Sequence, residues 1–196
     1  MLILKIYLLA GLVVHKAVWE FMKRQRPVDP SANQGSVHDK ARPSLLTQMI
    51  KATKIAILIG IAVQTVLPDV LPISSNALIL RIAGLLIYSA GLWIAIHSRK
   101  ELGANWSDIE TGRISDRHQI VSKGPYRFIR HPIYVGDLLL LFGLELALNS
   151  WLVLGVLLLA PVVLRQALRE EKKLVGSLPR YAEYCSSTKR FIPFVV

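Results

Sequence analysis

The chain alternates between long apolar runs and shorter segments rich in charge, proline or glycine. Five apolar runs are candidates for membrane-spanning helices, because such a helix needs roughly 20 mainly apolar residues. Asn149 and Ser150 alone separate the last two runs, and each of these runs is short for a full span, so together they predict a tight helical hairpin. The five runs are Leu2–Phe21, Leu45–Leu67, Leu78–His97, Ile133–Leu148 and Trp151–Leu164.

The same pattern predicts an all-α integral membrane protein that forms a single domain over residues 1–196. Three spans fall within residues 1–97, together with a mobile loop at 28–44 that is rich in Pro, Ser, Asn and Gly. Residues 98–196 contain the hairpin at 133–164. After the hairpin we expect the helix to leave the membrane, to break at Gly176 or Pro179, and to be followed by a short piece at Tyr181–Cys185.

The lysines and arginines predict the orientation of the chain. Residues 22–54, 98–134 and 165–196 each contain seven of them, whereas the Pro68–Ala77 loop and the Asn149–Ser150 turn contain none. Cytoplasmic loops of membrane proteins are enriched in Lys and Arg. Five spans with an external N-terminus would therefore place all three basic segments, and the C-terminus, in the cytoplasm. The short chain and plain topology favour a prokaryotic plasma membrane.

Composition narrows the class of protein further. The chain is 53% apolar and carries a formal net charge of +11. A soluble domain is usually less apolar, and no compact polar region remains that could bind nucleic acid, so the basic charge indicates contact with anionic lipid. Cys185 is the single cysteine, which excludes an internal disulfide and a multi-cysteine metal site; we expect no bound metal. Met1–Gly11 is similar to a signal peptide, but His15 and Lys16 interrupt it, and we interpret it as the first span.

The segment Gly124–Tyr134 concentrates residues that could carry chemistry. Pro132 is suited to begin a helix, which puts His131 close to the N-cap. A helix N-terminus beside Arg127 and Arg130 favours a carboxylate or a phosphate. The alternative is that the arginines only contact lipid headgroups and that His131 only caps the helix. Tyr126 and Tyr134 in the same segment favour a binding site.

Three carboxylates are further candidates. Glu170 and Glu171 follow the last span, and Glu170 can share a helix face with Arg165 and Gln166. An ordinary charged helix face is the alternative. Glu145 lies inside the fourth span, where a carboxylate marks a site by default, although its proximity to the hairpin turn also allows exposure at the outer surface.

Several short motifs, in this order and spacing, resemble the isoprenylcysteine carboxyl methyltransferases and the wider group of membrane methyltransferases that includes the phospholipid methyltransferases. The resemblance covers the chain from about Gly103 onward. The matching pieces are His118-Gln119-Ile120-Val121, Gly124-Pro125-Tyr126, Arg130-His131-Pro132-Ile133-Tyr134, Asn149-Ser150-Trp151, Glu170-Glu171-Lys172-Lys173-Leu174, Tyr181-Ala182-Glu183-Tyr184 and Arg190-Phe191-Ile192-Pro193.

This resemblance implies that S-adenosylmethionine is the methyl donor and binds in a cytoplasmic pocket beneath the C-terminal segment. In the prenylcysteine enzymes, an arginine four residues before the first glutamate of the pair orients the substrate carboxylate. Gln166 occupies that position here, with Arg165 and Arg169 as the neighbouring candidates. By motif, the donor contacts are His118, Gln119, Ile120, Val121, Tyr126, His131, Pro132, Ile133, Tyr134 and Glu170.

The predicted function is S-adenosylmethionine-dependent methylation of a lipophilic or lipid-modified substrate, most like carboxyl methylation of a prenylcysteine-type acceptor. The expected partners are this substrate and membrane lipids, and nothing in the sequence indicates an oligomeric state. The alternatives are a phospholipid-amine or thiol acceptor, a non-enzymatic membrane scaffold, and a nicotinamide-dependent membrane reductase.

Overall fold

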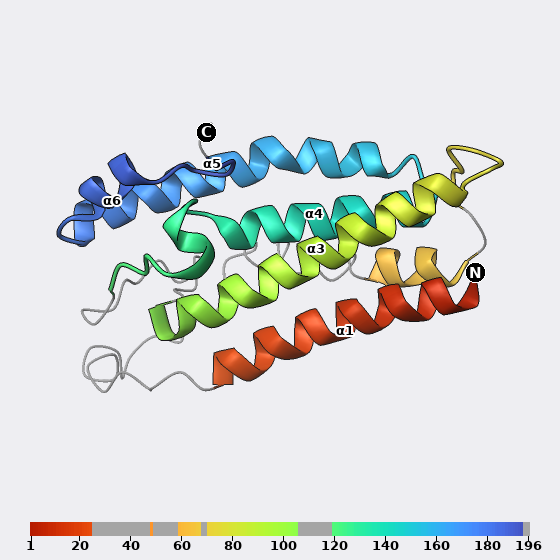
Figure 1. Cartoon of the computed structure of the whole chain (residues 1–196), viewed down its shortest axis with the longest axis horizontal. Helices are drawn as coiled ribbons and strands as arrows, with labels where there is room; N and C mark the ends of the chain where they lie inside the picture. The colour runs from red at the N-terminus through yellow and green to blue at the C-terminus, as the bar shows by residue number, and fades with distance from the viewer. Residues whose placement is uncertain (25–47, 49–58, 68–69, 106–118, 194–196) are drawn as a thin grey trace.

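The computed structural model describes residues 1–24, 48, 59–67, 70–105 and 119–193, and their secondary structure is helical (Figure 1). Residues 59–66 are also helical. The all-α prediction is confirmed over these ranges. The helices are α1 (Leu2–Arg24), α3 (Leu78–Leu102), α4 (Pro132–Ala147), α5 (Val153–Ser177) and α6 (Tyr181–Ser187), with short 3-10 turns η2 (Gly103–Asn105) and η3 (Gly124–Arg127).

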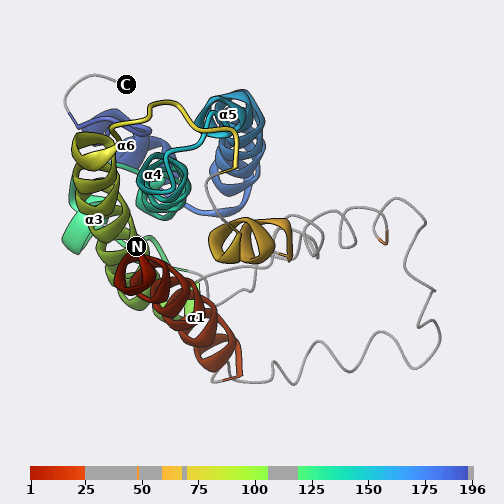
Figure 2. The same cartoon turned by 90° about the vertical axis from the view of Figure 1, so that its right-hand side faces the viewer.

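The long helices run side by side. α3 contacts α1 on one side and α4 on the other, and α5 packs against the far side of α4 (Figures 1 and 2). The turn between α4 and α5 lies at the same end of the molecule as the N-terminus. α6, η3 and the C-terminal end of α3 lie at the opposite end (Figure 1). Three segments that are distant in sequence therefore gather at this second end.

Glycines allow α3 and α4 to approach closely. A Cβ atom added at Gly84 or Gly91 of α3 would come within 3 Å of the α4 backbone, and one added at Gly136 or Gly143 would come equally close to α3. The glycines are seven residues apart on each helix, so they line one stripe of each. Small residues at such an interface let helix backbones pack directly, which is the usual way that helices associate in a membrane.

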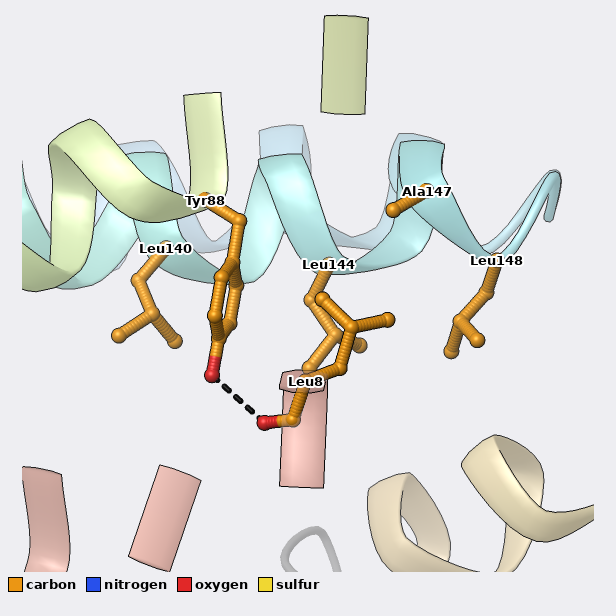
Figure 3. Packing of buried hydrophobic residues seen from close by; sticks show 6 residues of the cluster. All are labelled: Leu8, Tyr88, Leu140, Leu144, Ala147 and Leu148. Carbon is orange, nitrogen blue, oxygen red and sulfur yellow. Dashed lines mark hydrogen bonds between the residues drawn. The ribbon is translucent and has the colours of Figure 1, made fainter. Parts of the chain in front are cut away.

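The hydrophobic core joins α1 to this pair (Figure 3). Leu8, Tyr88 and Leu144 are fully buried there, with Leu140 and Leu148 beside them. The Tyr88 hydroxyl donates to the Leu8 carbonyl oxygen at 2.7 Å. The phenol therefore keeps a hydrogen-bond partner although the surrounding side chains are apolar.

The α4–α5 turn is not an exposed loop tip. Asn149 is buried with a positive φ of 58°, and its side-chain amide donates to the Ser74 carbonyl oxygen at 2.8 Å and accepts from the Ser74 amide at 3.1 Å. Glu145 is also buried, and it accepts a 2.7 Å hydrogen bond from Gln64. The predicted hairpin is confirmed, and the alternative of an exposed Glu145 is wrong because its turn packs on the residues before α3.

Two described helices, α1 and α3, are each long and apolar enough to cross a membrane. α4 has 16 residues, hence roughly 24 Å of helix, which is short of the roughly 30 Å hydrocarbon core. α5 continues without a break through the charged residues after Leu164, as predicted, and ends at Ser177. The count of five spans, their orientation and the division at residue 97 stay predictions. The loop at 28–44 and most of the 45–67 span lie outside the described residues.

Candidate active site

A pocket is lined by residues of α3, α4, α5 and α6 at one end of the helices. It contains eight of the ten residues expected to contact the donor. Pro132 is buried without lining the pocket, and His118 lies outside the described residues. The eight are Gln119, Ile120, Val121, Tyr126, His131, Ile133, Tyr134 and Glu170.

Tyr126 is held by the turn that precedes α4. Gly124 has a positive φ of 55°, a conformation that glycine adopts without strain, and Pro125 follows in η3. Tyr126 is buried, and its carbonyl oxygen accepts a 2.7 Å hydrogen bond from the Tyr184 hydroxyl of α6. Burial and the nearby Glu170 raise the pKa of Tyr126 well above its usual range, so its phenol stays protonated.

His131 is the N-cap residue of α4 and Pro132 is its first residue, as the sequence predicts. The imidazole is 5% exposed and stacks on Tyr134, with ring centroids 5.4 Å apart. Phe191, from the segment after α6, covers the ring at 5.7 Å. His131 thus links the helix start to the C-terminal segment.

Glu171 accepts hydrogen bonds from the side chains of His131, Arg130 and Arg190. His131 Nε2 lies 3.0 Å from Glu171 Oε1, Arg130 Nε lies 2.9 Å from the same oxygen, and Arg190 Nη2 lies 2.9 Å from Oε2. Burial of the carboxyl raises its pKa, but the three donors outweigh burial and hold the pKa of Glu171 well below its usual range. These four residues, the Glu171 cluster, tie the start of α4, the end of α5 and the C-terminal segment together.

Backbone pairing supports the Glu171 cluster. The Arg130 and His131 amides donate to the carbonyl oxygens of Lys189 and Arg190 at 2.8 and 3.2 Å, and the Lys189 amide donates to Phe128 at 3.1 Å. This short parallel bridge fixes the residues after α6 beside the pocket wall.

Glu170 faces the pocket, whereas Glu171 faces the cluster. The Tyr134 hydroxyl donates to Glu170 Oε2 at 3.0 Å, and His131 Nδ1 lies 3.9 Å from the same oxygen. Adjacent helical residues point about 100° apart, which explains why two neighbouring glutamates have different surroundings. Glu170 is the carboxylate that remains for a ligand.

The three residues expected to orient the substrate do not line this pocket. Arg165 and Arg169 are exposed on α5, and Gln166 is half-buried. Conversely, the pocket contains residues that sequence reasoning did not assign. Leu174 and Leu178 follow Glu170 at four-residue spacing, a signal that could have placed them on the same face. Tyr181 and Tyr184 were part of a matching motif. Leu102, the last residue of α3, and Asn105 of η2 gave no signal in the sequence.

The pocket has an inner and an outer part. The inner cavity measures about 90 Å³. An outer cavity of about 670 Å³, more open to solvent, shares Gln119, Ile120, Leu178 and Tyr184 with it. Cofactor sites typically measure roughly 300–1,000 Å³, so a ligand of that size must extend into the outer cavity or displace the shared wall.

Comparisons with known proteins place these features in a family. The family model for phospholipid methyltransferase matches residues 79–178, which is 100 of the 196 residues. The cobalt-zinc-cadmium resistance protein CzcN of Cupriavidus metallidurans (strain CH34) is 38% identical over 79 residues, covering 38% of this chain and 35% of that relative. This chain therefore matches about a third of the length of that curated relative.

A solved structure has a similar fold. The eukaryotic intramembrane Ras methyltransferase, isoprenylcysteine carboxyl methyltransferase, superposes with a TM-score of 0.56 at 18% sequence identity, over 81% of this chain and 55% of that chain. At this identity the likeness concerns the fold. The family model spans α3, α4 and the whole of α5, which supply three walls of the pocket. The chain belongs to the phospholipid methyltransferase family.

Proposed function

We propose that this protein is an S-adenosylmethionine-dependent methyltransferase that acts on a lipophilic acceptor at the cytoplasmic face of a membrane, in a prokaryotic plasma membrane with the C-terminus cytoplasmic. One observation carries the proposal. The residues that match the donor-binding motifs come from separate segments, at 119–134 and at 170, and gather around a single pocket at one end of the helices.

The chemistry of the pocket fits this donor. When bound, S-adenosylmethionine supplies a methyl group on a positively charged sulfonium. Tyr126, Tyr134, Tyr181 and Tyr184 line the pocket and offer aromatic faces to a cation or an adenine ring. Leu174 and its neighbours give the ring apolar contacts, and Glu170 can accept hydrogen bonds from ribose hydroxyls or an amine.

The charges around the pocket suit a ligand that carries both signs. Arg130 and Arg190 share the single carboxylate of Glu171, so one positive charge remains in the cluster and suits the carboxylate of the donor. Glu170 accepts a hydrogen bond from the Tyr134 hydroxyl, and its carboxylate lines the pocket. The Tyr134 hydroxyl orients this carboxylate, while the surrounding rings exclude water and strengthen its attraction for a cation.

The acceptor is proposed to be lipophilic because the pocket lies at the ends of helices whose outer faces are apolar. Phe21, Trp93 and Leu158 are among many large apolar side chains that α1, α3 and α5 expose. A prenylcysteine-type carboxylate is the acceptor that the motifs suggest. The exposed positions of Arg165 and Arg169 leave that carboxylate without its expected partner, which favours the second candidate, a phospholipid-type amine.

The test is competitive ligand binding to the full chain in detergent. Tritiated S-adenosylhomocysteine should bind in one-to-one ratio and should be displaced by unlabelled S-adenosylmethionine but not by NAD or NADP. Displacement by the nicotinamide nucleotides would support the reductase alternative. A folded protein that binds neither class would contradict catalysis by methyl transfer and favour a membrane scaffold.

A further inference from the structure

A second polar cluster lies outside the pocket, between α1 and α4. His15 Nε2 lies 3.0 Å from Asp137 Oδ1. Trp19 stacks on the imidazole, with ring centroids 4.2 Å apart and planes 25° apart, and the Arg99 guanidinium lies 5.9 Å from the Trp19 ring. Neither the pocket nor the Glu171 cluster uses His15 or Asp137.

This pair lies just below the pocket along α4. Asp137 follows Tyr134, which lines the pocket, by three residues, hence by roughly 4.5 Å along the helix axis. The two side chains are 22% and 38% exposed, on the side of the molecule where α1 and α4 face each other. The Asp137 carboxylate is also close enough to the pocket-lining Tyr134 to interact electrostatically with its phenol, so the pair adjoins the pocket wall.

The geometry of the pair suits proton transfer. The Asp137 carboxylate is hydrogen-bonded to Nε2 of His15, and Nδ1 of His15 has no hydrogen-bond partner among the described residues. A carboxylate that accepts from one imidazole nitrogen fixes the tautomer in which the other nitrogen can accept a proton, as in hydrolytic triads. Ionisable residues within membrane segments are costly and commonly functional.

We infer that His15, oriented by Asp137, accepts the proton from a lipophilic ammonium acceptor, an inference that rests on the proposed methyltransferase function. The ammonium N–H bond breaks and its proton moves to His15 Nδ1, which leaves a lone pair on nitrogen. That lone pair forms the N–C bond to the donor methyl as the C–S bond breaks, and the electron pair of that bond stays on sulfur. His15 then releases the proton to water. A carboxylate acceptor, already ionised at neutral pH, would need no such base.

Other charged groups lie near the His15–Asp137 pair. Asp137 is the charged neighbour on α4, and the Tyr134 phenol lies one helical turn away from it. Arg99 is the charged neighbour on α3, and it contacts the Trp19 ring. On α1 itself, Lys16 and Glu20 form an exposed pair at 2.9 Å, so their charges largely cancel. A reaction that needs an unprotonated base is slower in acid, so the wild-type rate should rise with pH.

The experiment uses the full chain in mixed micelles, with tritiated S-adenosylmethionine and two acceptor probes, phosphatidylethanolamine and an S-farnesylcysteine. His15→Gln should lower kcat for the amine by about 100-fold or more, in the range for loss of a general base, and should flatten the pH–rate profile between pH 5 and 8. Asp137→Asn should give a smaller loss. Donor KM and the calorimetric affinity for S-adenosylhomocysteine should stay within twofold.

The matched control is His97→Gln. His97 stacks on Trp93 at 5.2 Å with the same four-residue spacing as His15 and Trp19, but no carboxylate bonds to it among the described residues; its variant should keep the wild-type rate. If His15→Gln does not fold, His15→Ala is used in its place. This variant is assayed with and without added imidazole, and imidazole should restore part of the rate.

The outcomes separate the two proposals. Wild-type protein that fails to bind S-adenosylhomocysteine overturns the methyltransferase proposal itself. Protein that binds it but methylates only the carboxylate probe, or neither probe, overturns the inference about His15 alone. So does a His15→Gln variant that methylates the amine at the wild-type rate with the wild-type pH profile.

Discussion

His131 Nε2 lies 3.0 Å from Glu171 Oε1, and this contact joins the first residue before α4 to the last turns of α5. The same oxygen accepts from Arg130 Nε at 2.9 Å. Because both helices end at the pocket, the contact sets the distance between the wall that carries Tyr134 and the wall that carries Glu170. The cluster is therefore a structural support for the site.

Replacement of Glu171 should destabilise this end of the protein. In Glu171→Gln, two buried or half-buried arginines lose their counter-charge, and breaking a buried ion pair from one side costs about 3–5 kcal/mol. Thermal unfolding in detergent should show a clearly lower Tm. Glu183→Gln is the control, because Glu183 pairs with Arg180 on the exposed surface and its loss should leave the Tm unchanged. Equal Tm values for both variants would contradict the support role.

The Glu171 cluster should also make stability pH-dependent. The pKa of Glu171 in the folded protein lies below its value in the unfolded chain, which is about 4.3. Its stabilisation is thus complete above about pH 5 and is lost as pH falls. The wild-type Tm should drop between pH 5 and pH 3 by more than the Tm of Glu171→Gln does. Parallel curves for the two proteins would show that this carboxyl does not titrate abnormally.

Glu170 should act on ligand affinity and not on stability. Its described side-chain hydrogen bond is the one from Tyr134, so Glu170→Gln should keep the wild-type Tm. Loss of a charged acceptor for the ligand costs about 1.5–3 kcal/mol, hence roughly a 10- to 100-fold weaker affinity for S-adenosylhomocysteine by calorimetry. Lys172→Gln, an exposed neighbour on α5, should bind as wild type. A Glu170→Gln protein with undiminished affinity would remove Glu170 from the donor site.

The glycine contact between α3 and α4 gives a test of packing. A methyl group at Gly91 would collide with the backbone of α4 near Leu140, which cannot move without separating the helices. Gly91→Ala should therefore lower the Tm, at a cost of about 1–3 kcal/mol for overpacking. At Gly155, in α5, an added Cβ meets nothing within 4 Å, so Gly155→Ala should match or exceed the wild-type Tm. A Tm that is lower for Gly155→Ala than for Gly91→Ala would contradict the close approach of α3 and α4.

The sequence predicted the positions of the helices better than it predicted which helices pack against each other. Ile133–Leu148 was expected and Pro132–Ala147 is observed, because proline and the apolar run mark both ends. Periodicity shows which residues share a face, but not which helix that face meets. The pairing of His15 with Asp137, which are 122 residues apart, depends on α1 packing beside α4 and could not be inferred from either segment.

The candidate site shows the same limit. The motifs between 119 and 134 and Glu170 identified much of the pocket, since each is a compact local signal. The separate roles of Glu170 and Glu171 were not predictable, because they depend on where Arg190 returns beside α4. The burial of Asn149 was missed for the same reason: it depends on the loop at Ser74.

Methyl transfer itself is the most direct measurement of the central claim. Membranes that contain the full chain are incubated with S-adenosylmethionine tritiated in its methyl group, and label is counted in the organic-solvent extract. We expect label to accumulate in the lipophilic fraction, to be blocked by S-adenosylhomocysteine, and to fall sharply in membranes with Glu170→Gln. If the folded wild-type protein binds S-adenosylhomocysteine yet transfers no label to any extractable molecule, the claim of a lipophilic methyl acceptor is wrong.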